Sequence, residues 1–137
     1  MRILIVDDTK LIRDTLAELL ISCSGAFEIL TADNVKKAVE IIDSFSIDLL
    51  ITDIQMPKMN GLELLAYTAR NHPAVPAIVM TGFLDGEMYG KLNALGICNY
   101  VVKPFVFEDL LEKIFTCSGA HPAMYSDKPL PDVCRAK

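Results

Sequence analysis

The stretch Ile3-Leu4-Ile5-Val6-Asp7-Asp8 decides the fold of this chain, because a short apolar run ends abruptly at two carboxylates. No polar residue interrupts the four apolar ones, which is typical of a strand buried on both faces of a parallel sheet. Comparable runs follow at residues 27–31, 49–52, 77–80 and 97–102. The run at 27–31 is more polar than the others, which suits a strand at the edge of a sheet.

The segments between these runs have apolar residues at helical spacing. They cover residues 12–23, 35–42, 60–70, 85–95 and 107–115. In the first of them, Arg13 lies on the polar side of the predicted helix. Strands alternating with helices in this way predict right-handed crossovers and an α/β fold with a doubly wound parallel sheet. We expect five strands in the flavodoxin-like order 2-1-3-4-5, with sites at their carboxyl ends.

Length and composition indicate one domain with a substantial core. The chain has 137 residues, of which 52% are hydrophobic. Residues 118–137 hold three prolines and no periodic pattern. We therefore expect a domain over residues 1–117 and a flexible C-terminal tail over residues 118–137.

Charge and targeting signals narrow the class of protein. The net charge is −5 and lysine and arginine are not clustered, so direct nucleic-acid binding is not expected. The apolar runs are strand-sized rather than membrane-spanning, and the first residues do not resemble a signal peptide. The four cysteines form no C-x-x-C pair, which favours reduced thiols. We expect a cytoplasmic protein without membrane insertion.

Chemically active side chains follow four of the predicted strands. Asp7-Asp8 follows the first, Asp53 the third, Thr81 the fourth and Lys103 the fifth. The carboxyl ends of parallel strands share one edge, so these side chains should converge. Several carboxylates in one small site repel each other unless a cation is bound. A ligand set of oxygens alone, without histidine or cysteine, selects a hard ion such as Mg²⁺.

Such a site is suited to accepting a phosphoryl group. The Asp53 oxygen would attack, Lys103 and Mg²⁺ would neutralise the developing charge, and Thr81 would donate a hydrogen bond to a phosphoryl oxygen. Taken singly, each residue has an ordinary explanation as a helix cap, a turn residue or a solvated lysine. Their joint occurrence at successive strand ends favours the functional interpretation.

Four motifs in order carry a family resemblance. They are Asp7-Asp8, then Ile-Thr-Asp-Ile-Gln-Met-Pro-Lys-Met-Asn-Gly at 51–61, Met-Thr-Gly at 80–82 and Lys-Pro-Phe at 103–105. With this pattern the chain resembles a receiver domain of bacterial two-component response regulators, of the single-domain, chemotaxis-regulator-like kind. The resemblance covers about residues 1–117, everything except the predicted tail.

The resemblance implies a phosphotransfer site. Asp53 would receive its phosphoryl group from a phosphohistidine on a sensor histidine kinase or a histidine phosphotransfer protein. Asp8, Asp53 and the backbone carbonyl of Gln55 would bind Mg²⁺, with Asp7 acting directly or through water. Lys103 would pair with the phosphoryl group, and the bond from Lys103 to its proline would be cis.

The resemblance also implies a switch. Thr81 would move toward the phosphoryl group and the Tyr100 ring would turn inward, changing the surface around the last two strands and helices. The protein would be a phospho-accepting signalling switch of a phosphorelay, assisting its own phosphotransfer and dephosphorylation, rather than an enzyme. It would act on a separate protein target, as a monomer or as a phosphorylation-linked dimer.

Val106 stands where a capping aspartate or serine is expected before the last helix, so apolar surface is left near the switch. We therefore expect a partner-binding face here. Its residues would be Met88, Tyr89, Leu92, Tyr100, Val106 and Phe107. The alternative is simple packing of the last helix on the sheet, and full burial of Val106 and Phe107 would favour it.

Two other functions compete. A Mg²⁺-dependent phosphohydrolase would also use Asp53 as nucleophile, but such enzymes commonly carry a second carboxylate two residues later, where this chain has Gln55. Multiple turnover on phosphate esters would distinguish it. A flavodoxin-like electron carrier needs a phosphate-cradling loop after the first strand, and Asp7-Asp8 would repel the phosphate.

Overall fold

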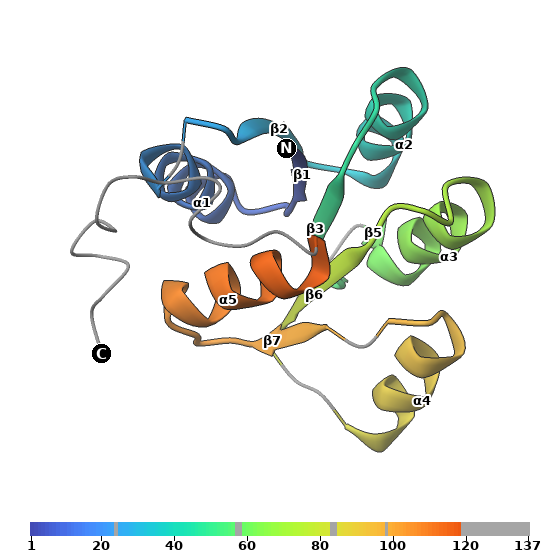
Figure 1. Cartoon of the computed structure of the whole chain (residues 1–137). Helices are drawn as coiled ribbons and strands as arrows, with labels where there is room; N and C mark the ends of the chain where they lie inside the picture. The colour runs from blue at the N-terminus through green and yellow to red at the C-terminus, as the bar shows by residue number, and fades with distance from the viewer. Residues whose placement is uncertain (24, 57–58, 83–84, 98, 119–137) are drawn as a thin grey trace.

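A computed structural model describes residues 1–23, 25–56, 59–82, 85–97 and 99–118, which form a sheet covered by helices on both faces (Figure 1). The sheet contains β1 (Arg2–Val6), β2 (Glu28–Ala32), β3 (Leu49–Asp53), β6 (Ala77–Thr81) and β7 (Tyr100–Val102). The helices are α1 (Lys10–Cys23), α2 (Val35–Ser44), α3 (Gly61–Asn71), α4 (Gly86–Ala94) and α5 (Phe107–Ser118). Two short strands, β4 (Gln55–Met56) and β5 (Met59–Asn60), form a separate hairpin.

The strands of the sheet lie in the order β2-β1-β3-β6-β7, and every neighbouring pair is parallel. Counted along the chain without the hairpin, this is the predicted order 2-1-3-4-5. The predicted edge position of the polar second strand is also confirmed, because β2 pairs with β1 at one end of the sheet. The other end is β7.

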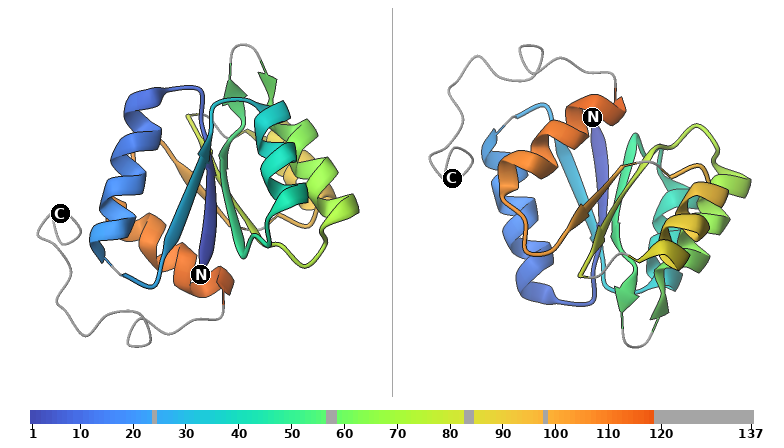
Figure 2. Two further views of the ribbon diagram at one scale, coloured as in Figure 1. Left: turned by 90° about the horizontal axis from the view of Figure 1, so that it is seen from above. Right: turned by 90° about the horizontal axis from the view of Figure 1, so that it is seen from below.

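Two apolar layers hold the sheet between its helices. Helices α1 and α5 cover one face, and α2, α3 and α4 cover the other (Figure 2). Alternate residues of β1 serve the two layers: Ile3 and Ile5 pack with residues of α1 and α5, whereas Leu4 and Val6 pack with residues of α2 and α3. Because side chains alternate across a strand, a strand buried on both faces must be apolar at every position.

The structure differs from the sequence-based expectations at several boundaries. The last strand begins at Tyr100 rather than at residue 97, and Ile97 is buried before the strand starts. The β4–β5 hairpin was not predicted, because strands of two residues carry no readable periodicity. Helix α5 runs to Ser118, so the predicted tail lies outside the described residues from 119 onward.

Side chains cap two of the helices. The Asn34 side chain accepts the N–H of Lys37 at 2.7 Å at the start of α2. The Asp85 side chain accepts the N–H of Met88 at 2.8 Å at the start of α4. No helix within the described residues has both the length and the hydropathy of a membrane span.

Candidate functional site

The carboxyl ends of the central strands bring the predicted acidic residues together. Asp7 follows β1 directly and Asp53 is the last residue of β3, which pairs with β1. One carboxylate oxygen from each of Asp7, Asp8 and Asp53 lies within 4.8 Å of the other two. Asp7 is fully buried and Asp53 is 5% exposed, while Asp8 is exposed. The predicted convergence of these carboxylates is therefore observed.

Lys103 reaches this cluster from the neighbouring edge of the sheet. Its Nζ lies 2.8 Å from Asp53 Oδ2 and 3.5 Å from Asp7 Oδ2. Burial opposes the charged form of Lys103, but the hydrogen bond to Asp53 and the charges of Asp7 and Asp53 outweigh it, so its pKa is raised. The ammonium is thus fixed as a cation between the two carboxylates. The peptide bond from Lys103 to Pro104 is cis, as expected.

Asp7 is held by its neighbours as well as by Lys103. The Thr9 N–H donates to Asp7 Oδ1 at 2.8 Å, and Arg13 Nη1 donates to the Asp7 carbonyl at 2.7 Å. The Asp7 N–H donates to the Ala32 carbonyl at 3.2 Å. Burial raises the pKa of Asp7, and the Thr9 N–H and Lys103 lower it in part. This carboxylate is costly to keep ionised, which is expected where a bound cation completes the site.

Sequence reasoning missed the role of Arg13. It was assigned to the solvated side of the first helix, whereas the structure places it half-buried with its guanidinium on the Asp7 carbonyl. The error comes from treating polarity as exposure, because a long side chain in the first turn of α1 can reach back to the preceding strand end.

Gly61 at the start of α3 closes the motif at 51–61, and its sequence position alone did not predict a close packing contact. It is buried, and a Cβ at this position would lie 2.5 Å from the Asp53 carbonyl oxygen and 2.6 Å from Ile54 Cα. The start of α3 therefore packs directly against the backbone behind the acidic cluster. Gln55, whose carbonyl is a predicted Mg²⁺ ligand, follows Asp53 by two residues. Its backbone pairs with that of Asn60 in the β4–β5 hairpin.

Thr81 lies on β6, which pairs with the strand that ends at Asp53, and Tyr100 lies on the next strand, β7. Thr81 is fully buried at the end of β6, next to Met80, the β6 residue that pairs with Asp53. The Thr81 carbonyl accepts the Lys103 N–H at 2.7 Å, so the ends of β6 and β7 are tied together. Tyr100 is half-buried and packs with the apolar layer that contains Leu92 of α4. The structure brings the acids and Lys103 into contact and leaves Tyr100 against α4.

The arrangement fits a hard divalent cation and a transferable anion. Three carboxylates share the cluster with one ammonium group, so negative charge exceeds positive charge. The donors are oxygens of the kind that Mg²⁺ prefers, and no histidine or cysteine belongs to this group among the described residues. Lys103 supplies a fixed positive charge beside the Asp53 oxygen, where a phosphoryl group would carry its own charge.

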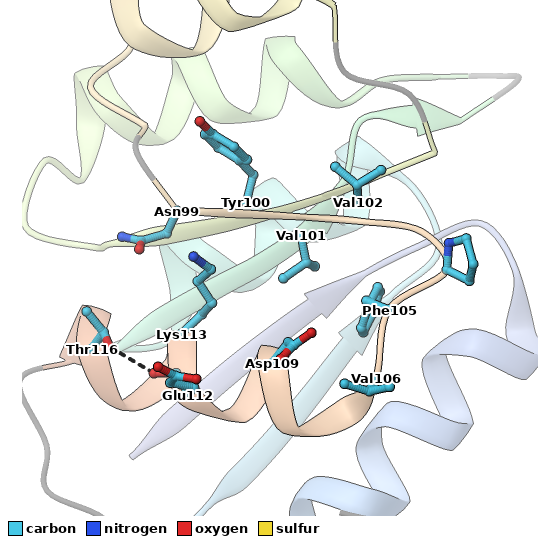
Figure 3. A pocket seen from close by; sticks show the side chains of 11 residues that line it. Asn99, Tyr100, Val101, Val102, Phe105, Val106, Asp109, Glu112, Lys113 and Thr116 are labelled. Carbon is cyan, nitrogen blue, oxygen red and sulfur yellow. Dashed lines mark hydrogen bonds between the residues drawn. The ribbon is translucent and has the colours of Figure 1, made fainter. Parts of the chain in front are cut away.

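A groove of about 500 Å³ lies elsewhere, between β7 and α5 (Figure 3). Val102, Val106 and Asp109 are among its lining residues, and none of the three aspartates of the cluster is. Figure 3 shows Tyr100 pointing to the opposite side of β7 from Val101. The groove is thus separate from the acidic cluster, and we assign it no part in the chemistry there.

Comparison with known families agrees with the geometry. A family model described as "Response regulator receiver domain" matches residues 3–115. Among curated relatives, Regulator of RpoS from Escherichia coli (strain K12) is 34% identical over 128 residues, covering 93% of this chain and 37% of that protein. Two-component response regulator ORR1 from Oryza sativa subsp. japonica is 32% identical over 130 residues, covering 88% of this chain and 56% of that protein. The chain thus spans well under two thirds of both curated relatives.

Solved structures match over nearly their whole length. The CheY-like response regulator receiver domain protein from Methanospirillum hungatei JF-1 has a TM-score of 0.78 and 32% sequence identity, covering 84% of this chain and 90% of that chain. Response regulator protein TrrA from Thermotoga maritima, solved in complex with Mg²⁺-BeF, has a TM-score of 0.73 and 34% identity, covering 85% of this chain and 97% of that chain.

Proposed function

This chain belongs to the response regulator receiver domain family, and from that premise we propose that Asp53 is the phospho-acceptor of a two-component signalling switch. The observation that carries the proposal is the position of the Asp53 carboxylate. It is almost fully buried, lies within 4.8 Å of two further carboxylates, and contacts the Lys103 ammonium at 2.8 Å. A purely structural role would not need three acids in one place.

Phosphotransfer requires few groups from this chain. An Asp53 oxygen forms the new P–O bond while the P–N bond of a phosphohistidine breaks, and the histidine nitrogen keeps the electron pair and then takes a proton from water. Asp8, Asp53 and the Gln55 carbonyl, with Asp7 directly or through water, would hold Mg²⁺, which when bound neutralises charge on the phosphoryl oxygens. Lys103 adds a fixed positive charge. Catalysis rests on positioning and electrostatics.

The switch that follows is local. An aspartyl phosphate carries about −1.5 to −2 charges in place of the single charge of the carboxylate, and it brings new acceptor oxygens beside Lys103 and the end of β6. Thr81 would donate to one of these oxygens, and Tyr100 would turn its ring toward the space that Thr81 leaves. These contacts favour one of two nearby conformations and change the surface over β7 and α4.

The predicted partner-binding face needs revision. Leu92 is fully buried and Phe107 is 8% exposed, so neither can contact a partner in this conformation. Tyr89 and Val106 are 40% and 39% exposed, and they remain candidates. We propose that a separate protein docks here, and that the phosphoryl donor is a sensor histidine kinase or a histidine phosphotransfer protein in the cytoplasm.

Intact-mass measurement with a small acyl-phosphate donor tests the proposal. Wild type should gain one phosphoryl group with Mg²⁺ and none without it, and Asp53→Asn should gain none. Because small donors fail with some acceptors, a wild type without an adduct is then incubated with a phosphohistidine donor. Absence of the adduct there too, or multiple turnover of phosphate esters, would overturn the assignment.

A further inference from the structure

Tyr89 and Tyr100 form an aromatic pair between α4 and β7. Their ring centroids lie 5.2 Å apart and their planes meet at 81°, which is an edge-to-face arrangement. Tyr100 is half-buried and projects from β7 to the side away from Val101 (Figure 3). Tyr89 is 40% exposed, and the Tyr100 ring is one of the groups that it contacts.

Helix α4 buries few of its side chains. Of its residues from Gly86 to Ala94, only Leu92 is buried. Half-buried Met88 packs against the same apolar layer as Leu92. Other contacts of α4 among the described residues include the Asp85 cap on the Met88 N–H at 2.8 Å and the surface pair of Glu87 and Lys91 at 3.3 Å. The ring contact from β7 therefore adds to a small set of apolar contacts that hold α4 among the described residues.

The backbone under Tyr100 is fixed, so its ring is the element able to change. Val79 pairs with Tyr100 and Thr81 with Val102 in the parallel ladder, and the Lys103 N–H donates to the Thr81 carbonyl at 2.7 Å. Rotation of the side chain moves the ring without breaking these bonds. A rotation that carries the Tyr100 ring toward Thr81 would change its edge-to-face contact with Tyr89.

We propose that Tyr89 is a positioning residue that holds the Tyr100 ring against α4 and so opposes the phosphorylated conformation. This inference rests on the switch role proposed above for Tyr100. Edge-to-face pairs shift a two-state equilibrium by about 2- to 10-fold. Because a ligand selective for one conformation binds more weakly when that conformation is less populated, the pair should weaken binding of a phosphoryl mimic by the same factor.

Beryllofluoride with Mg²⁺ is the probe, and its dissociation constant is measured by titration calorimetry. Tyr89→Ala should bind it about 2- to 10-fold more tightly than wild type. Tyr89→Phe keeps the ring and should restore the wild-type value. Tyr100→Ala removes the ring that Tyr89 holds, so adding Tyr89→Ala to Tyr100→Ala should leave the dissociation constant unchanged.

The contact itself has a separate readout. In Tyr89→Leu, which keeps apolar bulk on α4, the Tyr100 ring proton resonances should move because the ring current of Tyr89 is lost. Thermal unfolding of each variant shows that it is folded.

The outcomes separate the inference from the proposed function. Wild type that fails to bind beryllofluoride overturns the phosphorylation switch and this inference with it. Wild type that binds, with Tyr89→Ala unchanged or weaker, overturns the inference alone. The same holds if Tyr89→Ala still tightens binding in the Tyr100→Ala background, or if the Tyr100 resonances stay in place in Tyr89→Leu.

Discussion

The acidic cluster and the Tyr100 region belong to the same sheet, yet their side chains differ in burial. Asp7 and Asp53 stand on central strands and are 0% and 5% exposed. The side chains around the edge strand β7, which has only three residues, are more exposed. They are Tyr89 of α4 at 40%, Val102 of β7 at 44% and Val106 just before α5 at 39%. Two of the three carboxylates proposed to take part in phosphotransfer are buried, whereas the side chains beside the proposed switch are partly exposed.

The contrast suggests a division of work within the fold. Electrostatic catalysis needs charges that do not reorganise, and central parallel strands provide such fixed positions. A switch needs two conformations of similar free energy, and a sparsely buried helix beside an edge strand is suited to that requirement. Lys103 joins the two regions, because it follows β7 in sequence and contacts Asp53 in space.

Removing Lys103 should have the largest effect on this comparison. Lys103→Met should slow phosphoryl uptake from a small donor by about 100-fold or more, the range seen when one fixed charge-stabilising group is removed. The rate is measured by intact mass against time. Lys113→Met, a matched change in α5 within the groove of Figure 3, should leave the rate within about twofold. Equal loss in both variants would contradict the role of Lys103.

Two glycine substitutions contrast the two regions directly. Gly61→Ala places a Cβ 2.5 Å from the Asp53 carbonyl oxygen, and should lower the free energy of unfolding by about 1–3 kcal/mol. Gly90→Ala lies in α4, where a Cβ meets nothing within 4 Å, and should raise it by about 0.5–1 kcal/mol. Urea unfolding measures both. Destabilisation of similar size in the two variants would contradict the proposed difference in packing between the start of α3 and α4.

Arg13 tests how firmly the β1 strand end must be held. Arg13→Ala removes the 2.7 Å bond to the Asp7 carbonyl, and should weaken Mg²⁺ binding by about 5- to 10-fold, which corresponds to about 1–1.4 kcal/mol and lies within the range for one ordinary hydrogen bond. Titration calorimetry measures the affinity. Arg13→Lys should recover part of it. An unchanged affinity in Arg13→Ala would show that the other Asp7 contacts suffice.

The smallest effect on stability is expected at a hydrogen-bonded cluster that joins α2 to α3 and the residue following α3. Asp43 of α2 accepts the Tyr67 hydroxyl at 2.7 Å and contacts His72 Nε2 at 2.8 Å. The His72 and then the Tyr67 hydrogen bond lower the pKa of Asp43 below its usual 3.8.

A lowered pKa stabilises the folded state above pH 3.8, and this contribution is lost as pH falls through the folded value. Asp43→Asn should therefore lower the melting temperature at pH 7 slightly and make little difference in strong acid. Glu40→Gln on the same helix is the control, and phosphoryl uptake should be unchanged in both. A loss that is larger at low pH would contradict the sign.

Much of the fold and of the acidic site follows from local sequence. The uninterrupted run from Ile3 to Val6 predicted a strand covered on both faces. The residues that follow the first, third and fifth strands predicted the cluster, because the carboxyl ends of parallel strands lie at one edge of the sheet. Predictions failed where long-range geometry decides. Arg13 reaches a carbonyl that no periodicity reveals, Gly61 is required by a close approach of α3 to β3, and Leu92 and Phe107 are buried by packing.

The central claim is that Asp53 itself carries the phosphoryl group, and mapping the modified residue tests it most directly. Borohydride reduces an aspartyl phosphate to homoserine, which peptide mass spectrometry places at one position. After incubation with Mg²⁺ and a phosphoryl donor, we predict homoserine at position 53 alone, with none in a sample lacking Mg²⁺. Homoserine at Asp7 or Asp8, or at no position in a chain that has gained phosphate, would contradict the account.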